Sequence, residues 1–219
     1  MPPAVPSQQD NAFAALRQFA RKRPPAERCE MCSAEVGEEH EHLVEPANRK
    51  LICACTACAI LFEGQAGTKY KRVPREVLFL RDFQLSDAQW DGLMVPIEMA
   101  FFFKSTPHDK MIALYPSPAG PTESLLSLDT WTDIVEANPI LQKMQPDVSA
   151  LLVNRVGHVR GAAPAEYFLV PIDECYKLVG LIRAHWRGLS GGTEVWREIG
   201  AFFAGLKKRA GYRPEGVHA

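Results

Sequence analysis

Five of the six cysteines fall between positions 29 and 58 of this 219-residue chain. A Cys-x2-Cys pair at Cys29 and Cys32 is followed, after twenty residues, by Cys53, Cys55 and Cys58. Secreted disulfide frameworks spread their cysteines through the fold, whereas two Cys-x2-Cys pairs at this separation are typical of an intracellular metal site. Each pair turns two thiolates toward one ion, and two pairs complete a tetrahedron. The spacing therefore predicts a metal centre in the first third of the chain.

The residues between the two pairs predict a small hairpin followed by a helix. Segments 42–45 and 49–53 have the composition of short strands, and 46–48 supplies the turn between them. A helix is predicted over 56–63, ending at Gly64. This order, a Cys-x2-Cys knuckle, a hairpin and a second pair at a helix start, resembles a treble-clef zinc finger more than a zinc ribbon. We assign four metal ligands: Cys29, Cys32, Cys55 and Cys58.

Three other side chains in this segment could also bind a metal. Cys53 could replace Cys55 as a ligand, since Cys53 and Cys58 are also compatible with a pair. We expect instead that Cys53 is a buried strand residue, because a free cysteine behaves as a small hydrophobe. His40 and His42 lie in a glutamate-rich stretch, and we expect them to be exposed surface residues.

Four thiolates suit either Zn²⁺ or iron. Rubredoxin-like iron sites usually have glycines after their cysteine pairs, but serine and alanine occupy 33–34 here, and alanine and isoleucine occupy 59–60. This favours zinc in a closed structural site. A structural zinc supplies about 10–16 kcal/mol of folding free energy, and segment 25–69 has few large apolar residues, so we expect the metal to replace a core there.

From position 70 onward the pattern is that of a conventional globular core. Strands come mainly in succession rather than alternating with helices, which predicts an α+β fold with a largely antiparallel sheet and helices packed on one face. The proline-rich segment 116–121 is expected to be a turn, and Cys175 a core residue. The expected strands are 77–80, 97–104, 111–115, 125–128, 148–154 and 167–170; the expected helices are 87–94, 129–137, 173–187 and 193–210.

These predictions divide the chain into four parts. Residues 1–24 form a flexible tail with a short helix near 10–23, 25–69 the zinc module, 70–210 the α+β domain, and 211–219 a second flexible tail. The net charge of −1 argues against a dedicated nucleic-acid binder. No apolar run is long enough to span a membrane, and the amino-terminal charges follow the apolar residues, the wrong order for a secretory signal. We expect a cytoplasmic protein.

No familiar catalytic motif is present, and whether the carboxyl-terminal part is an enzyme stays open, with no catalytic residue assigned. A glycine-rich break ahead of the last helix could bind an anion through Arg187, Gly191, Gly192 and Thr193. The alternative is that one helix ends there and the next begins. An enzymatic site would require a deep polar pocket containing residues such as Arg155, His158, Arg183 or Arg187.

Two sequence segments resemble those of a known family, and the resemblance covers most of the chain after Arg28. One extends from Cys29-Glu-Met-Cys32 to Arg49-Lys-Leu-Ile-Cys-Ala-Cys-Thr-Ala-Cys58, and the other from Val170-Pro-Ile-Asp173 to Trp186-Arg-Gly-Leu-Ser-Gly-Gly192. They resemble an uncharacterised bacterial family often encoded beside nickel–iron uptake hydrogenases. The resemblance implies an accessory role with a protein partner, such as a hydrogenase component. The leading hypothesis is a non-enzymatic, zinc-stabilised binding or assembly protein; the alternative is a rubredoxin-like or iron–sulfur electron carrier using the same cysteines.

Overall fold

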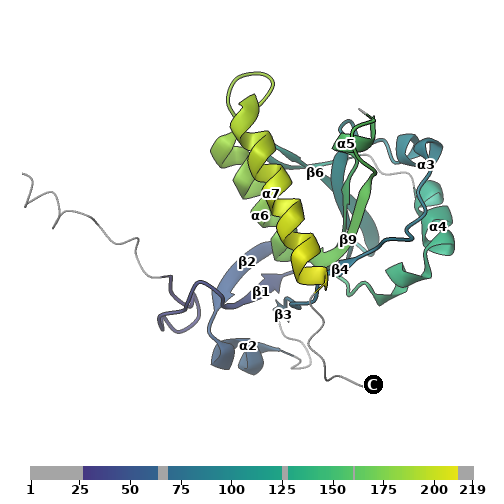
Figure 1. The fold of residues 1–219 in the computed structure, drawn as a ribbon. Coiled ribbons are helices and arrows are strands. Elements are labelled where there is room, and N and C mark those ends of the chain that lie inside the picture. Colours follow the sequence, from purple (N-terminus) through teal and green to yellow (C-terminus); the bar gives the residue numbers. More distant parts are fainter. Residues whose placement is uncertain (1–26, 64–68, 125–127, 160, 212–219) are drawn as a thin grey trace, which may run out of the picture.

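The computed structural model describes residues 27–63, 69–124, 128–159 and 161–211, and within them the strands form two sheets (Figure 1). The expected amino-terminal helix and most of the expected carboxyl-terminal tail lie outside the described residues. Every strand pair is antiparallel. The predicted α+β class with a mainly antiparallel sheet is confirmed.

The smaller sheet is built on the predicted hairpin. Strands β1 (Glu41–Glu45) and β2 (Lys50–Ala54) pair along their whole length, and β3 (Lys71–Arg72) joins the free edge of β1. Helix α2 (Thr56–Phe62) follows β2 directly, as predicted. β3 pairs with the hairpin although it lies beyond the expected module boundary at 69/70, which stays a prediction.

The larger sheet has six strands in the order β4-β9-β8-β5-β6-β7. Its two central strands, β5 and β8, are buried along almost their whole length. The strand bounds are β4 Leu78–Phe79, β5 Met99–Ser105, β6 Lys110–Ser117, β7 Gly120–Glu123, β8 Ser149–Asn154 and β9 Glu166–Pro171.

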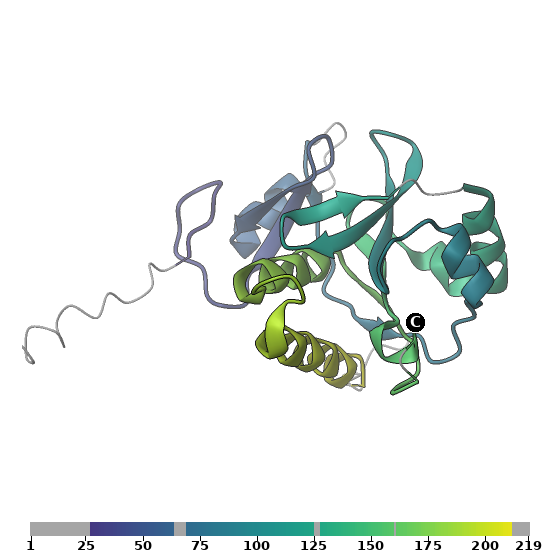
Figure 2. The ribbon, with the colours of Figure 1, turned by 90° about the horizontal axis from the view of Figure 1, so that it is seen from above.

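Helices cover both faces of this sheet, and the prediction that they pack on one face was wrong (Figure 2). In β5, Phe101 and Phe103 pack with α6 (Ile172–His185) and α7 (Gly192–Gly211). Ala100 and Phe102, which point the other way, pack with α3 (Asp87–Gly92) and α4 (Leu128–Ala137). A strand whose two faces are both covered is apolar on both faces, as β5 is from Met99 to Phe103.

Smaller differences from the expected elements have local causes. The proline-rich segment expected as a turn lies mostly in strands: Pro116 of β6 pairs with Pro121 of β7, and only 118–119 form the turn between them. Gly120, the first residue of β7, has a φ of +128°. β7 is an edge strand, where proline is tolerated. The expected strand at 125–128 lies largely outside the described residues, and Leu128 begins α4. Helix α5 (Val156–Val159) and the 3₁₀ helix η1 (Pro139–Lys143) were not predicted.

The two sheets share a core. Val44 of β1 and Val73, which follows β3, belong to the same buried cluster as Phe103 of β5 and Ile172 of α6. The small sheet is therefore packed against the larger one rather than tethered to it. No helix in the described ranges is long and apolar enough to cross a membrane.

Candidate metal centre

The fold brings the four predicted cysteine ligands together. The Sγ atoms of Cys29, Cys32, Cys55 and Cys58 all lie within 4.8 Å of one another. The Sγ atoms of Cys32 and Cys55 are 3.7 Å apart. A tetrahedron with Zn–S bonds of about 2.3 Å has sulfur–sulfur edges of about 3.8 Å, so this separation fits one shared ion. The four side chains could hold a metal ion.

The first pair is positioned by a tight turn that is tied to β2. The backbone N–H of Ser33 donates to the carbonyl of Cys29 at 2.8 Å, and Ser33 has a φ of +63°. The N–H of Glu30 donates to the carbonyl of Cys53, and the Glu30 carboxylate accepts from the N–H of Cys53 and from Lys50. These reciprocal contacts fix the knuckle against the strand that leads to the second pair.

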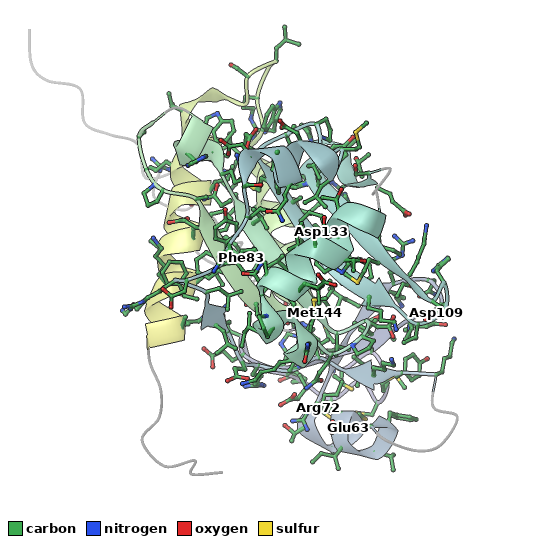
Figure 3. The ribbon with its side chains drawn as sticks, turned by 90° about the vertical axis from the view of Figure 1, so that its right-hand side faces the viewer. Glu63, Arg72, Phe83, Asp109, Asp133 and Met144 are labelled. Atoms are coloured by element: carbon green, nitrogen blue, oxygen red, sulfur yellow. The ribbon has the colours of Figure 1, made fainter. Side chains whose placement is uncertain are left out.

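The second pair is positioned by the start of α2. Cys55 is the N-cap residue, and its Sγ accepts a hydrogen bond from the N–H of Cys58 at 3.5 Å. At the other end of α2, Glu63 accepts from Arg72 of β3 at 3.0 Å, and Arg72 also donates to the buried carboxylate of Glu41 (Figure 3). The helix that carries Cys58 is thus attached to the small sheet at both ends.

The cysteines of this group differ in their burial, and Cys29 and Cys58 differ in their pKa. Cys29 and Cys58 are buried, whereas Cys32 is exposed. Burial raises the pKa of Cys29, but hydrogen bonds from backbone N–H groups, those of Cys55 and Cys32 foremost, outweigh it and lower that pKa to about 6. Burial and hydrogen bonds to the other sulfurs raise the pKa of Cys58 to about 12. Four thiolates this close repel one another, and a divalent cation removes that repulsion.

Comparison with known proteins places the chain in a family. A model described as "Family of unknown function (DUF5947)" matches residues 28–210. The chain belongs to this family. The match begins one residue before Cys29 and ends within α7, so it includes the four-cysteine group and the whole of the larger sheet. No curated protein and no solved structure matches the chain.

Cys53 does not join the four-cysteine group. It lies half-buried in β2 and forms a separate group with His40 and His42, whose ligating atoms are all within 4.8 Å of one another. The expectation that both histidines are exposed was wrong: only 7% of the His40 side chain and 28% of the His42 side chain are accessible. Glu39 and Glu41 flank His40 in the sequence, which suggested a solvated stretch, but Glu41 is itself buried between arginines.

Cys175, Arg155 and His158 are engaged in structural contacts, whereas Arg183 is exposed on α6. Cys175 is fully buried, as expected, and burial raises its pKa well above the usual value. The Arg155 guanidinium is buried over the ring of Trp90 and pairs with Asp87 at 2.6 Å and Glu98 at 3.2 Å. The same Asp87 oxygen lies 3.3 Å from Nε2 of His158. This network holds the segment after β8 against α3.

The predicted anion site lies where α6 ends and α7 begins. The Arg187 guanidinium donates to the carbonyls of Ala184 and Trp186 at the end of α6, and its backbone N–H donates to Gly191. α7 starts at Gly192. Anion binding at Arg187, Gly191, Gly192 and Thr193 stays a prediction.

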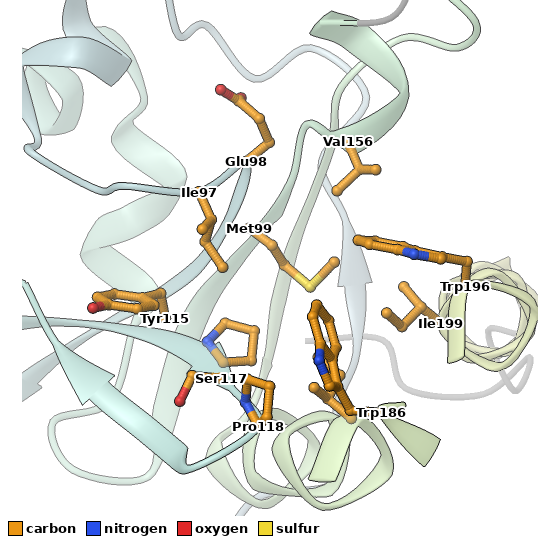
Figure 4. Close-up of a pocket in the computed structure, with 12 residues that line it drawn as sticks. Ile97, Glu98, Met99, Tyr115, Ser117, Pro118, Val156, Trp186, Trp196 and Ile199 are labelled. Carbon is orange, nitrogen blue, oxygen red and sulfur yellow. The ribbon is translucent and has the colours of Figure 1, made fainter. Parts of the chain in front are cut away.

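A cavity of about 410 Å³ opens between the larger sheet and the two long helices (Figure 4). Its walls are almost entirely apolar, with Trp186 and Trp196 on one side and Tyr115 on the other. Glu98 is the one charged residue among the residues that line it. None of the arginines and histidines expected in an enzymatic pocket lines this cavity.

Proposed function

We propose that this protein is a non-enzymatic binding or assembly protein whose amino-terminal part is stabilised by one Zn²⁺ held by Cys29, Cys32, Cys55 and Cys58. The convergence of the four sulfur atoms from a knuckle and a helix start carries the proposal. A tetrahedral ion with four thiolate ligands has no position left for a substrate, so its role is structural.

Iron in the same cysteines, serving electron transfer, is the alternative. Zinc is favoured because neither cysteine pair is followed by the glycines that usually free backbone amides for the sulfurs of rubredoxin-like iron sites. The two metals differ visibly, since a rubredoxin-like or iron–sulfur protein is red or brown and a zinc protein is colourless.

A docking role is supported by apolar residues that the fold leaves at the surface of the metal-bearing part. Ile60 and Leu61 of α2 are 60% and 58% exposed. Large apolar side chains side by side on a surface are common where a protein partner binds. The resemblance to a family encoded beside hydrogenases supports an accessory role toward a metalloenzyme such as a nickel–iron hydrogenase, in the cytoplasm.

Metal content of the purified full-length chain tests the metal assignment. We expect zinc, with Cys29→Ser and Cys58→Ser each lowering the content by one equivalent. Cys175→Ser, the same exchange at a buried cysteine of α6, leaves it unchanged. Retention of the full metal content in Cys29→Ser, or an iron chromophore in the parent protein, would refute the proposal.

Capture from the native host tests the docking role. The full-length chain is immobilised, and the retained proteins are compared with those retained by a variant carrying Ile60→Ser and Leu61→Ser. We expect metalloenzyme subunits or assembly factors to be retained by the parent and lost from the variant. The same proteins retained by both would contradict the assignment of the α2 surface.

A further inference from the structure

The two faces of the β1–β2 hairpin carry different groups. In the antiparallel register His42 lies directly opposite Cys53, so both side chains project from one face. Leu43 and Ile52, the next pair along, project from the other face and pack with Cys58. The four-cysteine group therefore belongs to one face of the hairpin, and His42 and Cys53 to the other.

His40 completes the group on the second face. It lies two residues before His42, and the two rings approach edge to face with their centroids 4.7 Å apart. One ligating atom from each of His40, His42 and Cys53 lies within 4.8 Å of the other two. Two imidazoles and one thiol therefore converge where the hairpin meets α6.

Hydrogen bonds define which nitrogen of each ring is available. His40 Nδ1 lies 2.8 Å from the carbonyl oxygen of Gly37, and His42 Nδ1 lies 2.8 Å from a carboxylate oxygen of Asp173 at the start of α6. Both partners are acceptors, so each Nδ1 carries the proton and donates. In a neutral ring the lone pair is then on Nε2. Histidines that bind metals typically donate their other N–H to a carbonyl or carboxylate in this way.

His40 Nε2 is the atom that most needs a further partner. Only 7% of the His40 side chain is accessible to solvent. Its Nε2 atom is buried and has no hydrogen-bond partner. Buried polar atoms in folded proteins are almost always paired. A nitrogen lone pair that is held in place through Nδ1, buried and unpaired is suited to coordinate a metal ion.

We propose that His40 Nε2, His42 Nε2 and Cys53 Sγ form a second metal site, for a divalent first-row transition-metal ion such as Zn²⁺. Two imidazoles and a thiolate are donors of the borderline softness that such ions prefer, and that Mg²⁺ and Ca²⁺ do not. One ligating atom of each residue already lies within 4.8 Å of the other two, near the edges of about 3.3–3.8 Å of a zinc tetrahedron.

The second site differs from the four-cysteine site in coordination. Three protein ligands leave the fourth position of a tetrahedral ion open to water or to a donor from another molecule. Asp173 of α6 holds His42 and so contributes the supporting contact, while the hairpin and the residue before it contribute the ligands. The ion held here therefore keeps one coordination position for an outside ligand, whereas the four-thiolate ion has none.

Metal stoichiometry of the full-length chain tests the proposal. The reduced protein is equilibrated with excess Zn²⁺, free metal is removed by gel filtration, and zinc per chain is counted. We expect two equivalents in the parent and in Cys175→Ser, and one in Cys53→Ser and in His42→Gln. Because the two variants remove different ligands, a folding defect in one does not obscure the result of the other; circular dichroism identifies any such defect.

Two results would overturn the second site: one equivalent in the parent that is lost in Cys29→Ser and kept in Cys53→Ser, or two equivalents in both Cys53→Ser and His42→Gln. The four-cysteine site is tested separately, since its loss in Cys29→Ser leaves the Cys53 comparison intact. Co²⁺ added to protein that carries one equivalent of Zn²⁺ provides a spectroscopic probe of the open site, because a thiolate-to-cobalt band must be absent in Cys53→Ser and present in Cys175→Ser.

Asp173→Asn distinguishes a positioning residue from a structural one. Loss of the carboxylate that orients a metal-binding histidine typically weakens metal affinity about 10–100-fold. We expect the Kd of the second equivalent to rise by this factor while the saturating stoichiometry stays at two. An unchanged Kd for Co²⁺ in Asp173→Asn would show that this carboxylate does not support the site.

Discussion

Removing the metal is expected to unfold α2 and the Cys29–Cys32 knuckle while leaving the larger sheet intact. The buried cluster of this part contains only two large aliphatic side chains, Leu43 and Ile52. At about 1.5–3 kcal/mol each, they contribute roughly 3–6 kcal/mol. Met31, Val36, Phe62 and Tyr70 pack against this cluster but are only partly buried, and a structural zinc contributes about 10–16 kcal/mol, so the ion is the largest single contribution.

The structure also indicates which elements stay folded when the metal is removed. α2 has seven residues, of which only Cys58 and Ala59 are buried, and a helix this short does not persist in water without tertiary support. β1 is different, because it pairs with β3 and places Val44 in the buried cluster that it shares with the larger sheet. Loss of the metal therefore releases the knuckle and α2 but not β1.

Hydrogen exchange measured by mass spectrometry checks this boundary. The reduced protein is stripped with a strong chelator, shown by elemental analysis to be metal-free, and compared with the zinc-loaded form. If the free energy of local opening falls by only about 4 kcal/mol, amide exchange becomes about 1000-fold faster. We therefore expect exchange to be at least about 1000-fold faster in peptides covering 28–36 and 55–63. Peptides covering β5, β8 and β9 are expected to be unchanged.

Re-addition of Zn²⁺ is the positive control and must restore protection. Cys53→Ser is the matched variant, because it loses the proposed second site but keeps the four-cysteine group, and it must behave like the parent. Full protection of α2 in verified metal-free protein would refute the argument that the ion replaces a hydrophobic core in this part of the chain.

Three further predictions concern the scaffold. Phe102→Ala removes a ring packed against two tryptophans at the centre of the larger sheet and is expected to cost about 3–5 kcal/mol in urea unfolding. The hydrogen bond from Arg72 is the main cause that lowers the pKa of Glu41 below its usual value, so this carboxylate stabilises the fold above its unfolded pKa of about 4.3 and loses that effect as the pH falls. The stability difference between the parent and Glu41→Gln must therefore be larger at pH 7 than at pH 3. Gly191→Ala is expected to destabilise by more than about 1 kcal/mol, because φ is +85° and the new Cβ would lie 2.8 Å from a valine methyl; Gly180→Ala, in a helix with open space around it, is expected to stabilise by about 0.5–1 kcal/mol in the same thermal melts.

The parts of the fold that the sequence predicts correctly are those determined by local chemistry. The knuckle, the hairpin turn and the start of α2 each depend on residues within a few positions of one another, and the cysteine spacing already implies their order. The long carboxyl-terminal helices also follow from local periodicity. The number of layers does not, because a continuous apolar run such as 99–103 fits a strand whether its second cover comes from α3 and α4 or from elsewhere.

The group of His40, His42 and Cys53 also depends on contacts that local sequence does not determine. His40 and His42 are two residues apart on an extended segment, a spacing that places two side chains on one face. Only the pairing register adds Cys53 to that face, and only the approach of Asp173, 131 positions beyond His42, buries it and fixes its ring. The sequence nevertheless shows His42 and Cys53 on the two strands of the predicted hairpin, with His40 two residues before the first strand. In one of the two possible registers of such a hairpin, the histidines and the cysteine share a face, so this combination predicts a group of metal-binding donors.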